Sequence, residues 1–345
     1  MPDDNEPGQP GTADADAIAA AGDGGNIKSP VTREAQAALA AWTVEAMAEA
    51  EPYPMPEVSE AQLREQAEAV LDRAAGAGGI DAGGAPSGGT GTAAGDFQTL
   101  AGGYGYPAPF TRFEVPWPYT QYPQVTIGKV FFNQLDSQGQ VRSYVASAAS
   151  IGNSAILTAG HVVHSGNGKP DGWSTNLVFV PAYKDNVRPL GTWAASYLIA
   201  RTAWYNNGNP NGLTEDIGGA VLRPLNGRKI SQVVGFLGFA WNWPREQHWF
   251  ECGYPAAPPF NGQRMNMVAA SYGYNGAVPG VPPVATGSDM TGGCSGGPWI
   301  RGMFSSNLAN GVNSYRQTNR PLEMNSPYFD DRAKSIKDSL VAGTP

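Results

Sequence analysis

The chain has 345 residues and a formal net charge of −8, and it contains 45 glycines and 29 prolines. This length can bury a core of two packed units, and the abundance of Gly and Pro favours many short strands over a helical bundle. The sequence contains no signal peptide and no apolar run long enough to span a membrane, and its basic residues form no pattern typical of nucleic-acid binding.

Charge is unevenly distributed along the chain. Residues 1–100 carry 17 Asp and Glu against 4 Lys and Arg, whereas residues 101–345 carry 13 against 18. Opposite charges favour docking of the first segment on the second. We expect residues 1–28 to be disordered, because they are acidic and rich in Ala and Gly.

Two short helices are predicted after this acidic lead. Ser29-Pro30 is typical of a helix start and predicts a helix to about residue 50, and a capping box at residues 59–62 predicts a second helix to about residue 71. Residues 74–95 are nearly all Gly, Ala, Ser and Thr, as expected of a flexible tether. We therefore interpret residues 1–95 as a removable or tethered regulatory leader. A helix pair of another function remains an alternative.

Short apolar runs separated by Gly, Pro and Asn turns predict two groups of β-strands, followed by a helix. The first group is 123–132, 141–151, 155–157, 177–180, 192–199 and 218–222; the second is 233–239, 249–252, 265–272, 298–302 and 312–315. Apolar residues at 329, 333, 336 and 340 predict a final amphipathic helix. This rhythm favours closed Greek-key barrels.

Three polar residues adjoin these apolar runs. His161 follows one run, Asp216 precedes another, and Ser295 stands among four glycines. Glycines around a serine suggest a backbone that exposes the hydroxyl, which a histidine base and an orienting carboxylate would activate. The amides of Gly293 and Ser295 would then bind a developing oxyanion.

Each of these residues also has a simpler interpretation. The serine run could be a Gly-rich turn, and Glu215 competes with Asp216 for the orienting role. His164 lies three residues after His161, which would suit a metal site, but no third ligand follows nearby. His248 is interpreted as a surface-loop residue.

Three segments resemble the motifs of trypsin-like serine endopeptidases of the chymotrypsin fold: Leu157-Thr158-Ala159-Gly160-His161, Asp216-Ile217, and Gly293-Cys294-Ser295-Gly296-Gly297-Pro298. Residues 250–255, 290–293, 310–315 and 326–329 are most similar to the secreted bacterial and fungal branch that includes the glutamyl endopeptidases. The resemblance covers about residues 115–345. Trp42-Thr43, Met47 and residues 54–56 resemble the pro-segment of this branch.

The resemblance implies an all-β fold, a double six-stranded antiparallel Greek-key β-barrel with a C-terminal helix behind a partly helical, partly disordered leader. His161 and Asp216 would lie on the first barrel (96–226), and Ser295 on the second (227–345). The implied function is that of a secreted serine endopeptidase acting on proteins or peptides without a cofactor, with its own leader as intramolecular inhibitor or chaperone. An esterase or amidase on the same three residues, and a catalytically silent binding module, are the alternatives.

The chain also departs from the family pattern. Val162 replaces the cysteine that commonly follows the histidine, and Cys294 replaces the acid that precedes the serine in the digestive enzymes. An ion pair between that acid and a freed N-terminus is therefore unavailable here. The resemblance places Cys252 near the serine motif, so we expect a disulfide between Cys252 and Cys294.

Substrate specificity is left open by the sequence. Asp289 lies six residues before Ser295, where trypsin-like enzymes carry the carboxylate that attracts a basic P1 side chain. Glutamyl-specific relatives share this Asp but add a histidine at the position of Asn313. Ser314, Tyr315 and Arg316 would complete the S1 site, and Arg316 could supply a positive charge or neutralise Asp289. Basic, broad or apolar, and acidic P1 preferences all remain open.

Overall fold

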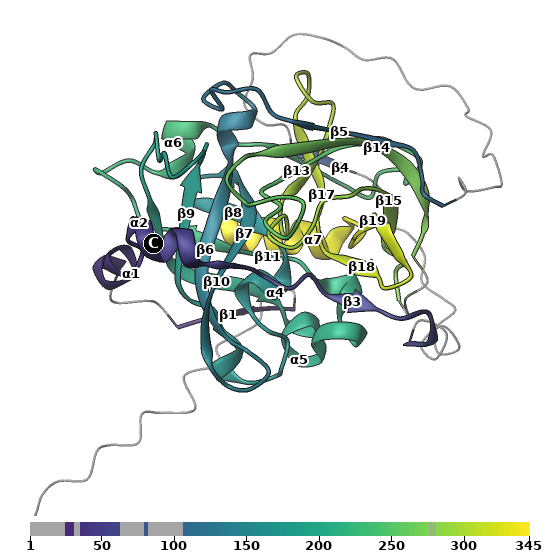
Figure 1. Ribbon diagram of the computed structural model, residues 1–345, viewed down its shortest axis with the longest axis horizontal. Helices are drawn as coiled ribbons and strands as arrows, with labels where there is room; N and C mark the ends of the chain where they lie inside the picture. Colours follow the sequence, from purple (N-terminus) through teal and green to yellow (C-terminus); the bar gives the residue numbers. More distant parts are fainter. Residues whose placement is uncertain (1–24, 31–34, 63–78, 82–105, 277, 279) are drawn as a thin grey trace, which may run out of the picture.

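The computed structural model describes residues 25–30, 35–62, 79–81, 106–276, 278 and 280–345. The first half of the body is a closed barrel of six antiparallel strands, shown beside the second sheet in Figure 1. They pair in the order β10-β11-β8-β7-β6-β9, and pairing of β9 with β10 closes the ring. The strands are β6 Ile127–Leu135, β7 Val141–Gly152, β8 Ala155–Thr158, β9 Thr175–Pro181, β10 Trp193–Arg201 and β11 Gly218–Leu222.

The second half forms another sheet, in which β18, β19, β15, β14, β13, β16, β17 and β12 pair in that order. Strand β5 pairs with β14 outside this path. The bounds are β5 Phe110–Glu114, β12 Gly238–Trp241, β13 His248–Gly253, β14 Asn266–Asn275, β15 Val284–Gly287, β16 Pro298–Arg301, β17 Leu308–Val312, β18 Tyr315–Gln317 and β19 Arg320–Ser326. The predicted all-β architecture with a closed six-stranded barrel and a second sheet is thereby confirmed.

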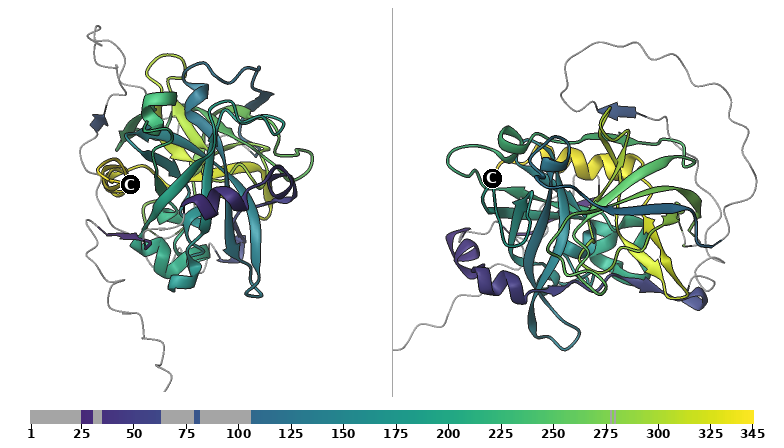
Figure 2. Two further views of the ribbon diagram at one scale, coloured as in Figure 1. Left: turned by 90° about the vertical axis from the view of Figure 1, so that its left-hand side faces the viewer. Right: turned by 45° about the horizontal axis from the view of Figure 1, so that its top comes forward.

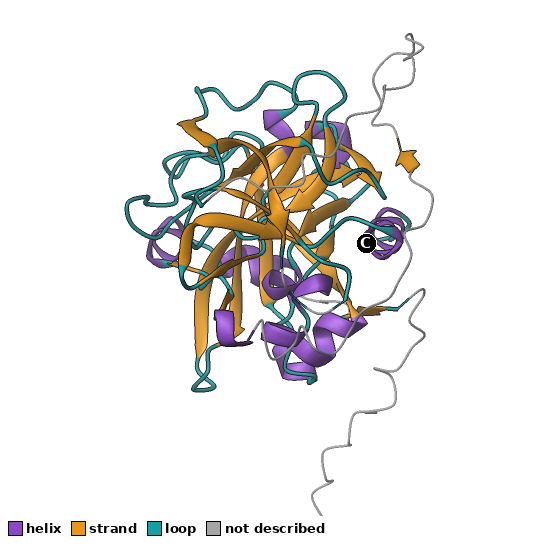
Figure 3. Ribbon diagram, turned by 90° about the vertical axis from the view of Figure 1, so that its right-hand side faces the viewer, coloured by secondary structure: helices purple, strands orange, loops and turns teal. Residues whose placement is uncertain are grey.

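Helices surround this strand core, as Figure 3 shows. Those of the body are α4 Gly160–Val163, α5 Thr202–Asn211, α6 Ile230–Val234 and α7 Asp331–Val341, with 3-10 turns η2 Gln124–Thr126, η3 Pro170–Gly172 and η4 Leu213–Glu215. The predicted C-terminal helix is confirmed as α7, which packs back onto β10 and β11 of the first barrel. No helix in the part of the chain that the structure describes is long and apolar enough to cross a membrane.

Several strand predictions need correction. The predicted strand 233–239 begins only at Gly238, because residues 230–234 form α6 and Gly235 ends that helix with a φ of +70°. The predicted strand 312–315 is instead the end of β17 and the start of β18. Strands β5, β15 and β19 were not predicted. Their burial depends on neighbours distant in sequence, which periodicity does not reveal.

The leader is bound to the body at several separate places (Figure 2). Its elements are β1 Asn26–Lys28, α1 Ala35–Ala41, α2 Val44–Glu49, β2 Glu51–Pro52, β3 Glu57–Val58 and β4 Gly79–Asp81. The strands β1, β2, β3 and β4 pair with β10, β7, β18 and β12 respectively. The leader thus adds strands to both halves of the body.

The predicted single helix to residue 50 is wrong in two respects. Ser29 extends the pairing of β1 instead of capping a helix, since it exchanges hydrogen bonds of 2.9 Å with Leu198. The helical stretch is also interrupted at Trp42 and restarts with Thr43 as N-cap of α2. The Trp42 side chain is only 3 % exposed and donates from Nε1 to the carbonyl of Asn176 at 2.7 Å. The break between the two helices therefore lies at a buried, hydrogen-bonded indole.

Other leader predictions have mixed outcomes. The capping box is confirmed, because the Ser59 amide donates to Oε1 of Gln62 at 2.8 Å and the Gln62 amide donates to Oγ of Ser59 at 3.2 Å. The expected disorder of residues 1–28 is wrong for β1. Residues 1–24, the continuation of the second helix and the Gly-rich tether lie outside the described residues.

The packing of α7 on the first barrel predicts a large contribution of Leu340 to stability. This side chain is fully buried. Leu340→Ala should lower the free energy of unfolding by about 2–5 kcal/mol, because it leaves a cavity, as measured by urea denaturation. Leu322→Ala is a matched control at a side chain that is 38 % exposed, and it should cost less than about 0.5 kcal/mol. Equal losses in the two variants would contradict this assignment of α7.

Candidate active site

His161 and Asp216 form a buried pair at one end of the first barrel. His161 lies in α4, directly after β8, and Asp216 ends η4 just before β11. The Nδ1 atom of His161 is 2.7 Å from Oδ2 of Asp216, and the His161 amide donates to Oδ1 at 2.7 Å. Ser314 donates its hydroxyl to Oδ2 at 2.5 Å. Three donors from two segments therefore fix this carboxylate against the imidazole.

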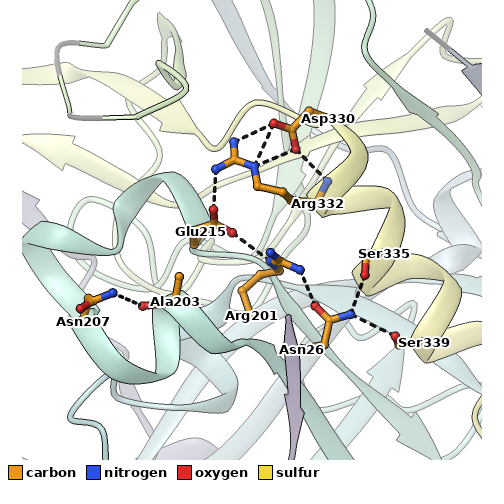
Figure 4. Close-up of polar contacts among 9 residues, drawn as sticks. All are labelled: Asn26, Arg201, Ala203, Asn207, Glu215, Asp330, Arg332, Ser335 and Ser339. Carbon is orange, nitrogen blue, oxygen red and sulfur yellow. Dashed lines mark hydrogen bonds and ion pairs between the residues drawn. The ribbon is translucent and has the colours of Figure 1, made fainter. Parts of the chain in front are cut away.

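Glu215, the competing acid, faces away from His161. Figure 4 shows its carboxylate between two guanidinium groups, at 2.9 Å from Nε of Arg201 and 2.5 Å from Nη1 of Arg332. Arg201 also donates from Nη1 to Oδ1 of the leader residue Asn26 at 2.8 Å. Asp216 is thus the acid that contacts the imidazole, while Glu215 ties its loop to β10 and α7.

The serine loop, residues 291–297, joins β15 to β16. Gly293 and Gly296 have φ angles of +97° and +76°, in the left-handed region that favours glycine. A Cβ at Gly296 would lie 1.8 Å from Oγ1 of Thr158 and 2.7 Å from the amide nitrogen of Ala159. The loop therefore packs directly against the chain that leads into His161.

Two amides of this loop point away from the groups that bind the preceding carbonyls. The Gly292 carbonyl accepts from the amides of Ala256 and Ala257 at 2.7 and 3.2 Å. The Cys294 carbonyl accepts from the Gly297 amide at 2.9 Å. In a trans peptide the N–H points opposite to the C=O. The amides of Gly293 and Ser295 therefore point to the other side, and within the described residues they donate to no acceptor.

Ser147 holds the serine loop from the first barrel. It lies on β7, and its hydroxyl donates to the Gly293 carbonyl at 2.9 Å while accepting from the Tyr254 amide at 2.9 Å. Its amide donates to the Ser295 carbonyl at 2.8 Å. The sequence analysis missed this residue. The only available signal was a small polar side chain inside a buried strand.

Two reactive atoms remain without partners at this junction. Neither Nε2 of His161 nor Oγ of Ser295 makes a hydrogen bond to any described residue, although both atoms are buried. The two atoms are therefore not hydrogen-bonded to each other in this structure. A buried polar atom without a protein partner calls for an explanation, such as an ordered water, a ligand or a catalytic role.

The expected disulfide between Cys252 and Cys294 is wrong: both cysteines are free and buried. Their backbones are close, since a Cβ at Gly253 would lie 3.0 Å from Cβ of Cys294. Their side chains, however, belong to different apolar clusters. Cys252 packs in the large core shared by both halves, and Cys294 packs with Trp299 and Met290 in the second sheet. Adjacent backbones are insufficient when the Cβ vectors diverge.

The two thiols are predicted to be unreactive in the folded protein. Burial raises the pKa of Cys294 to about 12 and raises that of Cys252 well above its ordinary value. Because the thiolate is the reactive species, native protein at pH 8 should not react with Ellman's reagent, whereas protein unfolded in guanidinium without reductant should release two equivalents. No release from unfolded protein would restore the disulfide.

The proposed S1 residues have different surroundings. Asp289 accepts from Nε of Arg112 at 2.9 Å, so Arg112 of β5 neutralises it, and the expected neutralisation by Arg316 is not found. Arg316 donates from its guanidinium to the carbonyls of Met290 and Pro321. Ser314 is bound to Asp216, and the Tyr315 side chain is fully buried. Arg112 was missed by the sequence analysis, since it lies 177 positions before Asp289.

Asn313 faces the protein interior. Its amide nitrogen donates to the carbonyls of Cys252 and Cys294 at 3.0 and 3.1 Å, and its oxygen accepts from the Trp299 indole at 2.8 Å. Asn313 therefore supports the serine loop, and these contacts leave it no spare group for a substrate carboxylate.

A buried carboxyl group lies near Asp289. Glu251 of β13 has 0 % exposure, and Thr286 donates to its Oε1, while Oε2 has no partner among the described residues. Burial raises the pKa of Glu251 to about 8, and the nearby charge of Asp289 adds to the shift. Glu251 is therefore mostly protonated at pH 7.

The contacts of the other two histidines, His164 and His248, bear on whether they bind a metal or lie in a surface loop. His164 is buried, accepts from the Gly166 amide at Nδ1 and contacts the Lys169 carbonyl with Nε2, each at 2.9 Å. Burial lowers its pKa to about 4. Among the described residues, no group of three or more His, Cys, Asp or Glu could hold a metal. His248 is exposed but begins β13 and is not in a loop.

No protein-family model matches the chain, and no curated protein matches it in sequence. Among solved structures it is similar to the protease Anisep of Arthrobacter nicotinovorans, with 36% identity and a TM-score of 0.56 over 64% of this chain and 96% of that one. The thermostable serine protease AL20 from an extremophilic microorganism gives 36% identity and a TM-score of 0.56 over 64% of this chain and 98% of that one.

A Glu endopeptidase, at 15% identity and a TM-score of 0.52 over 67% of this chain and 97% of that one, shares the fold. The chain belongs to the trypsin-like serine proteases.

Proposed function

We propose that this protein is a serine endopeptidase that acts through His161, Asp216 and Ser295. The observation that carries the proposal is the 2.7 Å contact between His161 and Asp216. This buried pair lies beside the serine loop, whose Gly293 and Ser295 amides donate to no described group. Since Asp216 binds Nδ1, the other ring nitrogen is left free to accept a proton from the serine hydroxyl.

The mechanism follows from these positions. His161 accepts the proton of Ser295 as Oγ attacks a peptide carbonyl, and Asp216 stabilises the imidazolium. The amides of Gly293 and Ser295 bind the oxyanion of the tetrahedral intermediate. His161 then protonates the leaving amine, and water hydrolyses the acyl-enzyme by the same steps in reverse. Every proton in this cycle is carried by groups of this chain, so no cofactor is invoked.

Two alternatives use the same residues differently. An esterase or amidase would hydrolyse small substrates but leave proteins uncut, and a silent binding module would bind peptides without turnover. The site favours an enzyme over a silent module, because all three reactive side chains are present and Nε2 of His161 and Oγ of Ser295 have no structural partner.

We also propose that the protein is made as a precursor and acts outside the cell. The leader buries Ala38, Trp42, Met47 and Val58 in the main apolar core, which supports a role in folding or restraint of the body. The secreted location rests on the family resemblance. The buried thiols favour neither a secreted nor an intracellular location, because their raised pKa makes them inert in oxidising and reducing surroundings alike.

The test of the proposed function is covalent labelling of Ser295. A fluorophosphonate reacts irreversibly, so label accumulates even when the site opens for a small fraction of the time. After prolonged incubation, we expect one label per chain on Ser295 by peptide mapping. Ser295→Ala should take up no label and lose all hydrolysis of casein above background. Ser305→Ala, at an exposed serine of another loop, is the matched control. Label on other residues, or label and casein hydrolysis that persist in Ser295→Ala, would contradict the assignment of Ser295 as the nucleophile.

For specificity, we propose that Asp289 does not select a basic P1 residue, because Arg112 already neutralises it. Wild type should therefore cut peptides with apolar or small P1 residues better than those with Arg or Lys. Arg112→Ala should free the carboxylate and raise kcat/KM for P1 Arg relative to P1 Ala by about two- to fivefold, as expected for a partly exposed charge pair. The double variant Arg112→Ala/Asp289→Ser should lose this gain in kcat/KM for P1 Arg. A wild-type preference for Arg that persists in Asp289→Ser would contradict the proposal.

A further inference from the structure

The leader segment 51–58, which we call the strap, passes over the candidate active site. Figure 1 shows this part of the leader running from α2 across both halves of the body to β3. At its start, the Tyr53 amide donates to the Val145 carbonyl of β7 at 3.1 Å. At its end, the Arg316 amide of β18 donates to the Pro56 carbonyl at 3.0 Å. The strap therefore binds the first barrel and the second sheet at once.

Tyr53 of the strap lies on the reactive histidine. Its ring is stacked on the His161 imidazole, with centroids 5.4 Å apart and an interplanar angle of 22°. It also contacts the rings of Phe132 and Tyr144, with centroids 5.4 and 4.9 Å away. Its hydroxyl donates to Oε1 of Gln134 at 2.5 Å, and Gln134 in turn donates to the His161 carbonyl at 3.3 Å.

The strap also contacts the serine loop. A Cβ at Gly292 would lie 2.8 Å from the Tyr53 carbonyl oxygen and 3.5 Å from Cβ of Pro52. The strap backbone therefore lies against the residue just before the Gly293 amide. An aromatic ring on His161 and a backbone on Gly292 therefore cover the proposed base and the residue next to the proposed oxyanion donor Gly293.

The sequence of the strap protects it from hydrolysis. Residues 51–57 read Glu-Pro-Tyr-Pro-Met-Pro-Glu, so each peptide bond between Glu51 and Glu57 has a proline on one side. A proline nitrogen carries no hydrogen and its ring fixes φ, and the residue before it is also restricted. A backbone restricted in this way does not easily adopt the conformation in which Ser295 Oγ attacks the peptide carbonyl and His161 protonates the leaving nitrogen.

We propose that the strap is a non-cleavable autoinhibitory segment that closes the active site through Tyr53 and resists the enzyme through Pro52, Pro54 and Pro56. This inference rests on the proposed protease function. The strap occupies the active site of its own chain. It pairs with β7 at its start and with β18 at its end, and the buried Trp42 that precedes it holds it in place.

The first experiment uses the full chain and tests the role of Tyr53. Tyr53→Ala should accelerate both fluorophosphonate labelling of Ser295 and peptide hydrolysis by about tenfold or more, since it removes three ring contacts and a hydrogen bond. Tyr53→Phe keeps the stacking and should remain close to wild type. Val44→Ala, at an exposed leader residue outside the strap, should have no effect. Circular dichroism of each variant checks the fold.

The second experiment tests the prolines. The double variant Pro54→Ala/Pro56→Ala should be cut between residues 51 and 57 on incubation, as seen by mass spectrometry, whereas wild type should stay intact there. Adding Ser295→Ala to the double variant should abolish the cut. A double variant that stays intact while Ser295 remains reactive would overturn the protective role of the prolines.

The outcomes separate the two proposals. If label never reaches Ser295 in wild type or in Tyr53→Ala, the protease function fails and the strap proposal fails with it. If Ser295 reacts at the same rate in both proteins, the protease function stands and the autoinhibitory role of the strap is overturned.

Discussion

The structure depends on the contact of Ser147 with the serine loop. This one residue of β7 binds two carbonyls of the second half and the amide of Tyr254, just after β13. Within the loop itself, the amides of Ala256 and Ala257 hold the Gly292 carbonyl and the Gly297 amide holds the Cys294 carbonyl; because a carbonyl and the next amide share one peptide plane, the Gly293 and Ser295 amides point to the opposite side. The Ser147 hydrogen bonds therefore join the first barrel to the same loop that carries the two free donors of the candidate oxyanion site.

The two adjacent acids near His161, Asp216 and Glu215, have different partners. Asp216 is fully buried and uses its oxygens on His161 and Ser314. The adjacent Glu215 points to Arg201 and Arg332, so the negative charge of this second acid is neutralised away from the imidazole. Breaking a buried charge pair is costly, which suggests that the Glu215 contacts hold the loop in the one position where Asp216 reaches the imidazole. The Arg112 contact with Asp289 neutralises a third carboxylate near the serine loop.

The leader is integrated into the fold. It supplies strands to both sheets and buried side chains to the main core, and one of its aromatic rings covers His161. Removal of a segment held by β-pairing and apolar burial requires more than cleavage of a tether, because the contacts persist after the chain is cut. Processing of such a leader would therefore have to reach the strap or the helices before it.

The sequence by itself determined the strand-rich class, the C-terminal helix and the positions of His161, Asp216 and Ser295, because local apolar periodicity, turn residues and short motifs are written in neighbouring positions. Only the tertiary structure decided which groups these residues meet. Ser147, Arg112 and Tyr53 lie far from their partners in sequence, and nothing local to them signals the contact. The two cysteines show the same limit: their backbones are adjacent, as the resemblance implied, but their side chains pack in separate apolar clusters and form no disulfide.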